Sequence, residues 1–308
     1  MNYGERLVVE LNRYRFARTV RGMLETAPVV LDGSGPIVLS MIQHRDVHAA
    51  LLACKSLLRF VPARRLVVIA DPSMTPADRG LLRRHFPGVE IREAREFQHP
   101  DLPQGGTWER LAAIAEYVSE AFVIQLDADT VALAPLPEVT AAVATATAFT
   151  LGTADHQQAQ SCAAAVAEAR ERMRAEAHIQ LLAESRLDQL EGAEALRYVR
   201  GCSGFAGYPQ GSFDPARLRQ LSRRLAALLG PRWREWGTEQ FTSNLLLASM
   251  PGFKVLPHPR YCAPPRQTAD TVFLHFIGYV RYASGLYASV CRDVVADLRG
   301  PASARSRA

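Results

Sequence analysis

The 308-residue chain is predicted to adopt an α/β fold built on a parallel sheet, and three observations predict it. Short β-branched apolar runs alternate with segments of helical periodicity in the N-terminal half. Two of these runs end directly on acidic residues, at Asp71 and at Asp127. A hydrophobic content of 48% is sufficient for a substantial core. Strand and helix in alternation give parallel strands joined by right-handed crossovers.

The alternation begins after an N-terminal extension. Residues 1–35 interleave apolar side chains with arginines and glutamates in a partly helical pattern, and Gly33, Gly35 and Pro36 end it. Thr107 stands where it would cap a helix. We predict strands at 37–41, 66–70, 89–92 and 122–126, and helices at 47–60, 75–85 and 108–119.

The second half of the chain is less regular. Residues 154–199 are rich in Ala, Glu, Arg and Gln and contain no proline, which predicts a helical insertion. That insertion is either a solvated pair of helices without ligand contact or a wall or lid over a site. The core domain is expected to span 36–282, followed by a C-terminal helix and a disordered polar tail within 283–308. Further helices are expected at 215–229 and from 236 to 250, with an edge strand at 254–257.

Charge and cysteine content limit the classes of function. The formal net charge of +5 comes mainly from arginines spread over the whole chain, which favours a small anionic ligand over nucleic acid. The five cysteines lie far apart without a Cys-x-x-Cys pair, so we expect reduced, mostly buried thiols. With no leader and no uninterrupted apolar span, we expect a soluble, cytoplasmic protein without a transmembrane segment.

The motif with the clearest chemistry is Asp127-Ala128-Asp129, which follows the apolar run 122–126. A strand of a parallel sheet would present both acids at its carboxyl end, where open α/β sheets bind ligands. In extended backbone, side chains two apart share a face, so both carboxylates could hold one Mg²⁺ or Mn²⁺ and its diphosphate. The alternative is a polar turn that leaves a core strand.

Three later motifs add to this one. Ser203 and Gly204 belong to a glycine-rich segment, which a bulged strand would also explain. Glu239 and Gln240 are adjacent at the expected start of a helix. The third motif is His275-Phe276-Ile277-Gly278-Tyr279-Val280-Arg281.

Together, the four motifs resemble those of the metal-dependent GT-A glycosyltransferases, most closely family 8, the group of glycogenin and the bacterial lipopolysaccharide galactosyltransferases. The resemblance covers residues 37 to 282 and implies a mixed central sheet flanked by helices. Arg281 replaces the family's lysine, Tyr282 its usual proline and Cys202 a common asparagine, so one sugar contact differs. The implied metal ligands are Asp127, Asp129 and His275, and the implied donor contacts are Asp127, Ser203, Gly204, Gly278 and Arg281. The resemblance places Gln240 close to the reacting carbon, and Glu239 beside it would orient backbone or acceptor groups at the helix start.

Four further residues are expected near the nucleotide. Gln43 and His44 follow the first strand and Asp71 the second, where such folds hold the base and ribose, although each could be a cap or a surface residue. Arg110 lies just inside the helix before the Asp127 strand and is expected to reach the nucleotide.

The resemblance implies a hexosyltransferase that uses a nucleotide-sugar donor, a UDP-hexose, with retention. The acceptor is open: a small molecule, a saccharide or a protein. One alternative is an inverting GT-A enzyme with Glu239 as general base. The other is a non-catalytic sugar-nucleotide-binding protein. The presence of Asp127, Asp129 and His275 speaks against it, because such a protein could lose its metal ligands.

Overall fold

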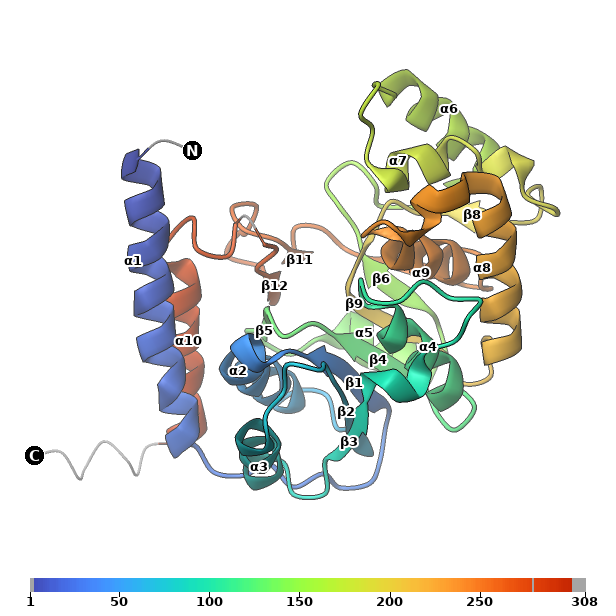
Figure 1. The fold of residues 1–308 in the computed structure, drawn as a ribbon. Helices are drawn as coiled ribbons and strands as arrows, with labels where there is room; N and C mark the ends of the chain where they lie inside the picture. The colour runs from blue at the N-terminus through green and yellow to red at the C-terminus, as the bar shows by residue number, and fades with distance from the viewer. Residues whose placement is uncertain (1–2, 279, 301–308) are drawn as a thin grey trace, which may run out of the picture.

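The central feature of the computed structural model, which describes residues 3–278 and 280–300, is a seven-stranded sheet in the order β10-β6-β9-β4-β1-β2-β3. Strand β9 is antiparallel to both neighbours, and the other pairings of this sheet are parallel. The predicted α/β fold with a mixed sheet is confirmed (Figure 1). The strands are β1 (Ile37–Ile42), β2 (Arg65–Ala70), β3 (Glu90–Glu93), β4 (Val123–Leu126), β6 (Phe149–Leu151), β9 (Cys202–Tyr208) and β10 (Lys254–Leu256).

Both faces of the sheet are covered, because its strands present apolar side chains on each side. In β2, Leu66 and Val68 belong to one apolar core, whereas Val67 and Ile69 belong to the other. This alternation follows from the two-residue period of a strand. Helices α2 (Val47–Leu58), α3 (Pro76–His85) and α10 (Leu286–Arg299) contribute to the first core, and α4 (Trp108–Tyr117), α8 (Pro215–Leu229) and α9 (Thr238–Ala248) to the second.

One predicted helix cap is wrong. Thr107 does precede α4, but its φ is 73° and its hydroxyl makes no capping hydrogen bond. The hydroxyl donates to Glu239 Oε2 at 2.9 Å instead. A contact across 132 residues of sequence has therefore replaced the local cap.

The insertion contains more than helices. It consists of α6 (Cys162–Arg172), α7 (Ile179–Glu184) and a short 3₁₀ turn, and it also holds the antiparallel strands β7 (Gln160–Ser161) and β8 (Arg197–Tyr198). The two strands pair because the chain enters and leaves the insertion side by side. In Figure 1 the insertion lies above α8 and α9.

A second sheet, of three strands, joins distant parts of the chain. It contains β5 (Thr130–Ala132), β11 (Tyr261–Cys262) and β12 (Phe273–His275). Strand β12 runs antiparallel to β5, with His275 opposite Thr130. This register brings the third motif next to the aspartates.

The N-terminal and C-terminal helices pack against each other at one edge of the molecule (Figure 1). Helix α1 (Tyr3–Val20) is followed by the 3₁₀ helix η1 (Arg21–Glu25). The Phe16 ring stacks on the Tyr287 ring of α10 with centroids 3.8 Å apart. Residues 301–308 of the predicted tail, and Tyr279 of the closing motif, lie outside the described residues.

Two expectations from composition concern the whole chain. Within residues 3–278 and 280–300, no helix has both the length and the apolar character needed to cross a membrane. The cysteine thiols are free, and all but the half-buried Cys202 are buried, as expected.

Candidate metal and donor site

Asp127 and Asp129 lie in the turn between β4 and β5, not in extended backbone as predicted. The turn is held from two sides. Asp127 N donates to Gly204 O of β9, and the Thr130 hydroxyl donates to Asp127 O, each at 2.8 Å. The two carboxylates therefore converge because the backbone turns, not because of strand alternation.

His275 completes a group of three ligand residues. The Phe276 amide donates to Asp129 O at 2.8 Å, which fixes β12 against the turn. His275 Nε2 then lies 3.1 Å from Asp129 Oδ1 and 3.8 Å from Asp127 Oδ2. Ligand atoms of the three residues all lie within 4.8 Å of one another, and two carboxylates with an imidazole suit a divalent cation. These residues form a candidate metal site.

Burial and neighbouring charges oppose each other at this site. Burial favours neutral His275, but Cys202 and Asp129 outweigh it and hold the pKa of the imidazole well above its ordinary value. Burial likewise opposes the charge of Asp129, but His275 and Arg281 hold the pKa of that carboxyl well below its usual range. A cation at this site would compete with the proton of His275, since only the neutral imidazole is a ligand.

Strand β9 shapes the space around His275. A β-carbon on Gly204 would overlap the His275 ring, so only glycine leaves room for the imidazole. Cys202 Sγ lies 3.4 Å from His275 Nδ1. This cysteine therefore contacts one of the candidate metal ligands, a contact that sequence alone did not reveal.

Each aspartate of the site is paired with its own arginine. Arg110 pairs with Asp127, and Arg281 pairs with Asp129. Arg281 Nη1 also donates to Asp46 Oδ1 at 2.9 Å. Asp46 was not predicted, because it lies four residues after the end of β1, whereas Asp71 follows β2 directly.

Glu239 and Gln240, in the first turn of α9, have different environments. Glu239 is 2% exposed, and both of its carboxylate oxygens lie 3.3 Å from Arg110 Nη2. Burial raises the pKa of Glu239, while Arg110 and Thr107 oppose the shift. Gln240 is half-buried, and its Oε1 accepts from the Ser203 amide at 3.4 Å. Glu239 is thus held in a buried ion pair, whereas Gln240 is the more accessible of the two.

Three of the four residues predicted near the nucleotide, Gln43, His44 and Asp71, follow the carboxyl ends of β1 and β2, whereas Arg110 lies in α4 and pairs with Asp127. The His44 amide donates to Ser73 Oγ at 3.1 Å, and Ser73 Oγ donates to Asp71 Oδ1 at 2.6 Å. Gln43 is exposed, as is Gly278 of the closing motif. In the described chain, no hydrogen bond joins Gln43, His44 or Asp71 to the metal-site residues.

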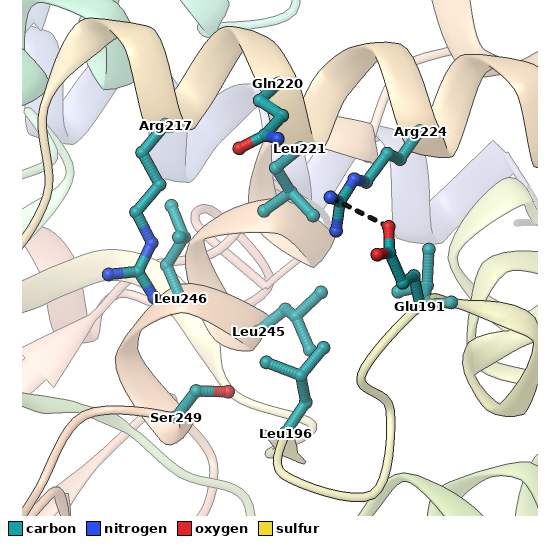
Figure 2. Close-up of a pocket in the computed structure, with 10 residues that line it drawn as sticks. Glu191, Leu196, Arg217, Gln220, Leu221, Arg224, Leu245, Leu246 and Ser249 are labelled. Atoms are coloured by element: carbon teal, nitrogen blue, oxygen red, sulfur yellow. Dashed lines mark ion pairs between the residues drawn. The ribbon is translucent and has the colours of Figure 1, made fainter.

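A separate cavity of about 130 Å³ lies between α8, α9 and the loop of the insertion (Figure 2). Its apolar lining includes Leu221 and Leu245, and Arg224 at its rim pairs with Glu191 at 2.9 Å. None of the predicted site residues lines it. It is smaller than the roughly 300–1,000 Å³ of most ligand pockets, so we do not assign the donor to it.

No protein-family model matches the chain, and no curated protein matches its sequence. The solved structure of the apo bifunctional glycosyltransferase WbbM is similar, with a TM-score of 0.50, 13% identity and coverage of 87% of this chain and 50% of that one. The chain therefore spans half the length of WbbM.

Two structures of LgtC are also similar. An active-site mutant of LgtC gives a TM-score of 0.50 at 12% identity, over 84% of this chain and 94% of that one. The structure of the galactosyltransferase LgtC with donor and acceptor sugar analogs gives a TM-score of 0.49 at 12% identity. This match covers 84% of this chain and 95% of LgtC. The mixed sheet and the two matches at 0.50 establish that this chain has the GT-A glycosyltransferase fold.

Proposed function

We propose that this protein is a metal-dependent glycosyltransferase that moves a hexose from a nucleotide-sugar donor, a UDP-hexose, to an acceptor hydroxyl with retention of configuration. The observation that carries the proposal is the convergence of Asp127, Asp129 and His275 on one point of a GT-A fold. The chemistry of these side chains fits Mn²⁺ or Mg²⁺. The likeness to family 8 supports the same assignment.

The residues around the site would have different roles in the reaction. When bound, a divalent cation would supply positive charge next to the departing nucleoside diphosphate. Arg281, already paired with Asp129, would add a second positive charge on the same side. Arg110 holds Asp127 and Glu239 in place and so orients one metal ligand and the start of α9.

The two residues at the start of α9 bear on stereochemistry. An inverting enzyme would need a carboxylate that can take the acceptor proton. Glu239 is 2% exposed and paired with Arg110, which supports an orienting role. Gln240 is more accessible and uncharged, and it suits a retaining route in which the leaving diphosphate takes the acceptor proton on the same face.

The experiment that tests the proposal is donor hydrolysis with UDP-glucose and UDP-galactose, with and without Mn²⁺. We expect Asp127→Asn, Asp129→Asn and His275→Ala each to lower the rate by about tenfold or more, because each removes a metal ligand. Asp188→Asn, which breaks an exposed pair with Arg170, is the matched control and should retain activity. Full turnover in EDTA would contradict metal dependence, and the absence of hydrolysis with both donors would favour a non-catalytic protein.

A further inference from the structure

A cavity of about 600 Å³ lies between the N-terminal helix and the closing motif. Its walls come from α1, the start of η1, the connection between β1 and α2, and the segment after β12. Gly278 and Arg281 of the closing motif line it. The volume lies within the roughly 300–1,000 Å³ of ligand-binding pockets. We refer to it as the α1 cavity.

The lining of the α1 cavity is basic, although most of its arginines are already paired. Glu10 lies 3.3 Å from Arg13, and Arg281 pairs with both Asp46 and Asp129. Arg13, Arg21, Arg45 and Arg281 line the cavity, and Asp46 is the one acidic residue among its described lining residues. Asp46 is already engaged, because its Oδ1 accepts from Arg281 at 2.9 Å and its Oδ2 lies 3.5 Å from Arg45.

Arg21 lies at the start of η1, and its charge is not neutralised locally. No acidic side chain in residues 3–278 or 280–300 pairs with it. His48 also lines the cavity, and burial and then Arg21 lower the pKa of its imidazole. An anion in the cavity would relieve this repulsion among positive charges.

Helix α1 is fixed to the closing motif through Tyr282. The Asn12 side-chain amide donates to Tyr282 O at 3.1 Å, and Arg13 Cζ lies 5.5 Å from the Tyr282 ring centroid. The Phe16 ring also lies 5.9 Å from that ring. Tyr282 stands where family 8 usually has proline. The residue that differs from the family pattern is therefore the one that contacts the N-terminal helix. That contact keeps α1, which carries Arg13, against the segment that carries Arg281, and both arginines line the cavity.

We propose that the α1 cavity binds a phosphate or diphosphate group between Arg21, Arg13 and Arg281, so that the N-terminal extension forms one wall of the substrate site. Arg281 connects the two regions, because one of its nitrogens pairs with Asp46 at the cavity and the other with Asp129 at the metal site. The ligand is carried either by the donor's diphosphate or by a phosphate on the acceptor. This choice of carrier, but not the anion site itself, rests on the proposed function.

Binding of inorganic pyrophosphate, measured by isothermal titration calorimetry in EDTA, tests the anion site without a contribution from metal. We expect Arg21→Ala to weaken the affinity by about fivefold or more, because a charge-assisted hydrogen bond is lost, and Arg13→Ala to weaken it further in the double variant. Arg21→Lys should retain part of the affinity. Arg18→Ala is the matched control, since Arg18 lies in α1, three residues before Arg21, and outside the cavity lining. Equal affinities for Arg21→Ala and Arg18→Ala, or no binding by the wild type, would overturn the assignment.

Donor hydrolysis without acceptor distinguishes the two carriers. If the donor's diphosphate occupies the cavity, pyrophosphate inhibits competitively against the nucleotide sugar and Arg21→Ala raises the KM for the donor. If an acceptor phosphate occupies it, inhibition is not competitive and that KM is unchanged. Pyrophosphate binding that depends on Arg21 in a protein that hydrolyses no donor would contradict the proposed function and support the anion site. Metal-dependent hydrolysis with Arg21-independent pyrophosphate binding would contradict the anion site alone.

Discussion

Arg281 contacts carboxylates on two sides, Asp46 and Asp129, and its charge and shape can be separated by mutation. We predict that Arg281→Ala slows sugar transfer more than Arg281→Lys, because lysine keeps the positive charge beside the leaving diphosphate but loses the fork that spans both acids. Steady-state kinetics with one donor at saturating Mn²⁺ would measure both variants. Equal rates would argue against a phosphate role for Arg281.

Gly204 leaves the space that the His275 ring occupies. We predict that Gly204→Ala weakens Mn²⁺ affinity by about tenfold or more, because the added methyl displaces a metal ligand. Calorimetric titration of the purified variant with Mn²⁺ would measure this.

Gly207→Ala is the matched control for that experiment. Gly207 lies on the same strand, and its added β-carbon would overlap Phe149 in the apolar core rather than His275. It should lower thermal stability while the folded protein keeps its affinity for Mn²⁺. A Gly204→Ala variant that binds Mn²⁺ as tightly as Gly207→Ala would contradict the spatial role of Gly204.

At the scale of single elements, the first turn of α9 sets the stereochemical expectation. We predict that Gln240→Ala lowers turnover more than donor affinity and that an α-linked donor gives an α-linked product, because Gln240 is the accessible residue of the pair. Glu239→Gln should instead lower thermal stability, since it breaks a buried ion pair with Arg110. Proton NMR of the product measures the linkage, and a β-linked product would overturn both the mechanism and the residue roles.

Most helices, together with strands β1 to β4 and β10, could be predicted from local pattern. The start of α2 at Val47 and both ends of α8, for example, agree with the sequence analysis. Strands β7 and β8 could not be predicted, because each has two residues and is defined only by its partner. The hydroxyl of Thr107 was misassigned for a related reason, since the competing acceptor on Glu239 is distant in sequence.

Residue chemistry and order predicted which side chains converge at the candidate metal site, namely Asp127, Asp129 and His275. Contacts between side chains of distant elements could not be predicted from the sequence. The Cys202 thiol beside His275 and the pairing of Arg281 with Asp46 depend on how β9, β12 and the β1–α2 connection meet. Local periodicity carries no information about contacts between distant elements, because these contacts depend on tertiary packing.

At the scale of the molecule, acid stability is expected to depend on His85 at the end of α3, away from the metal site. The side chain is 2% exposed, and neither ring nitrogen has a hydrogen-bond partner among the described residues. Burial, then Lys55 and Arg84, lower the pKa of His85 to about 4. Because the unfolded chain takes up this proton near pH 6.5 and the folded protein does not, stability falls as the pH drops from 6.5 toward 4.

We predict that His85→Leu reduces the loss of unfolding free energy between pH 7.5 and pH 5 by about 1 to 2 kcal/mol. Urea denaturation at the two pH values measures the difference for the wild type and the variant. His99→Gln is the control, because the side chain of His99 is 41% exposed. This variant should lose as much unfolding free energy between pH 7.5 and pH 5 as the wild type does. An unchanged loss in His85→Leu would show that other groups control acid stability.

The pairing of β12 with β5 has a consequence for synthesis of the chain. Asp129 and His275 are separated by 146 residues, so the ribosome delivers the two aspartates well before the histidine. At the usual 5–20 residues per second, this interval is roughly 7 to 30 s. During that time the nascent protein carries an incomplete ligand set, which is completed only after β12 emerges and docks. Cation binding would therefore distinguish chains in which β12 has paired with β5 from chains whose synthesis stopped before β12.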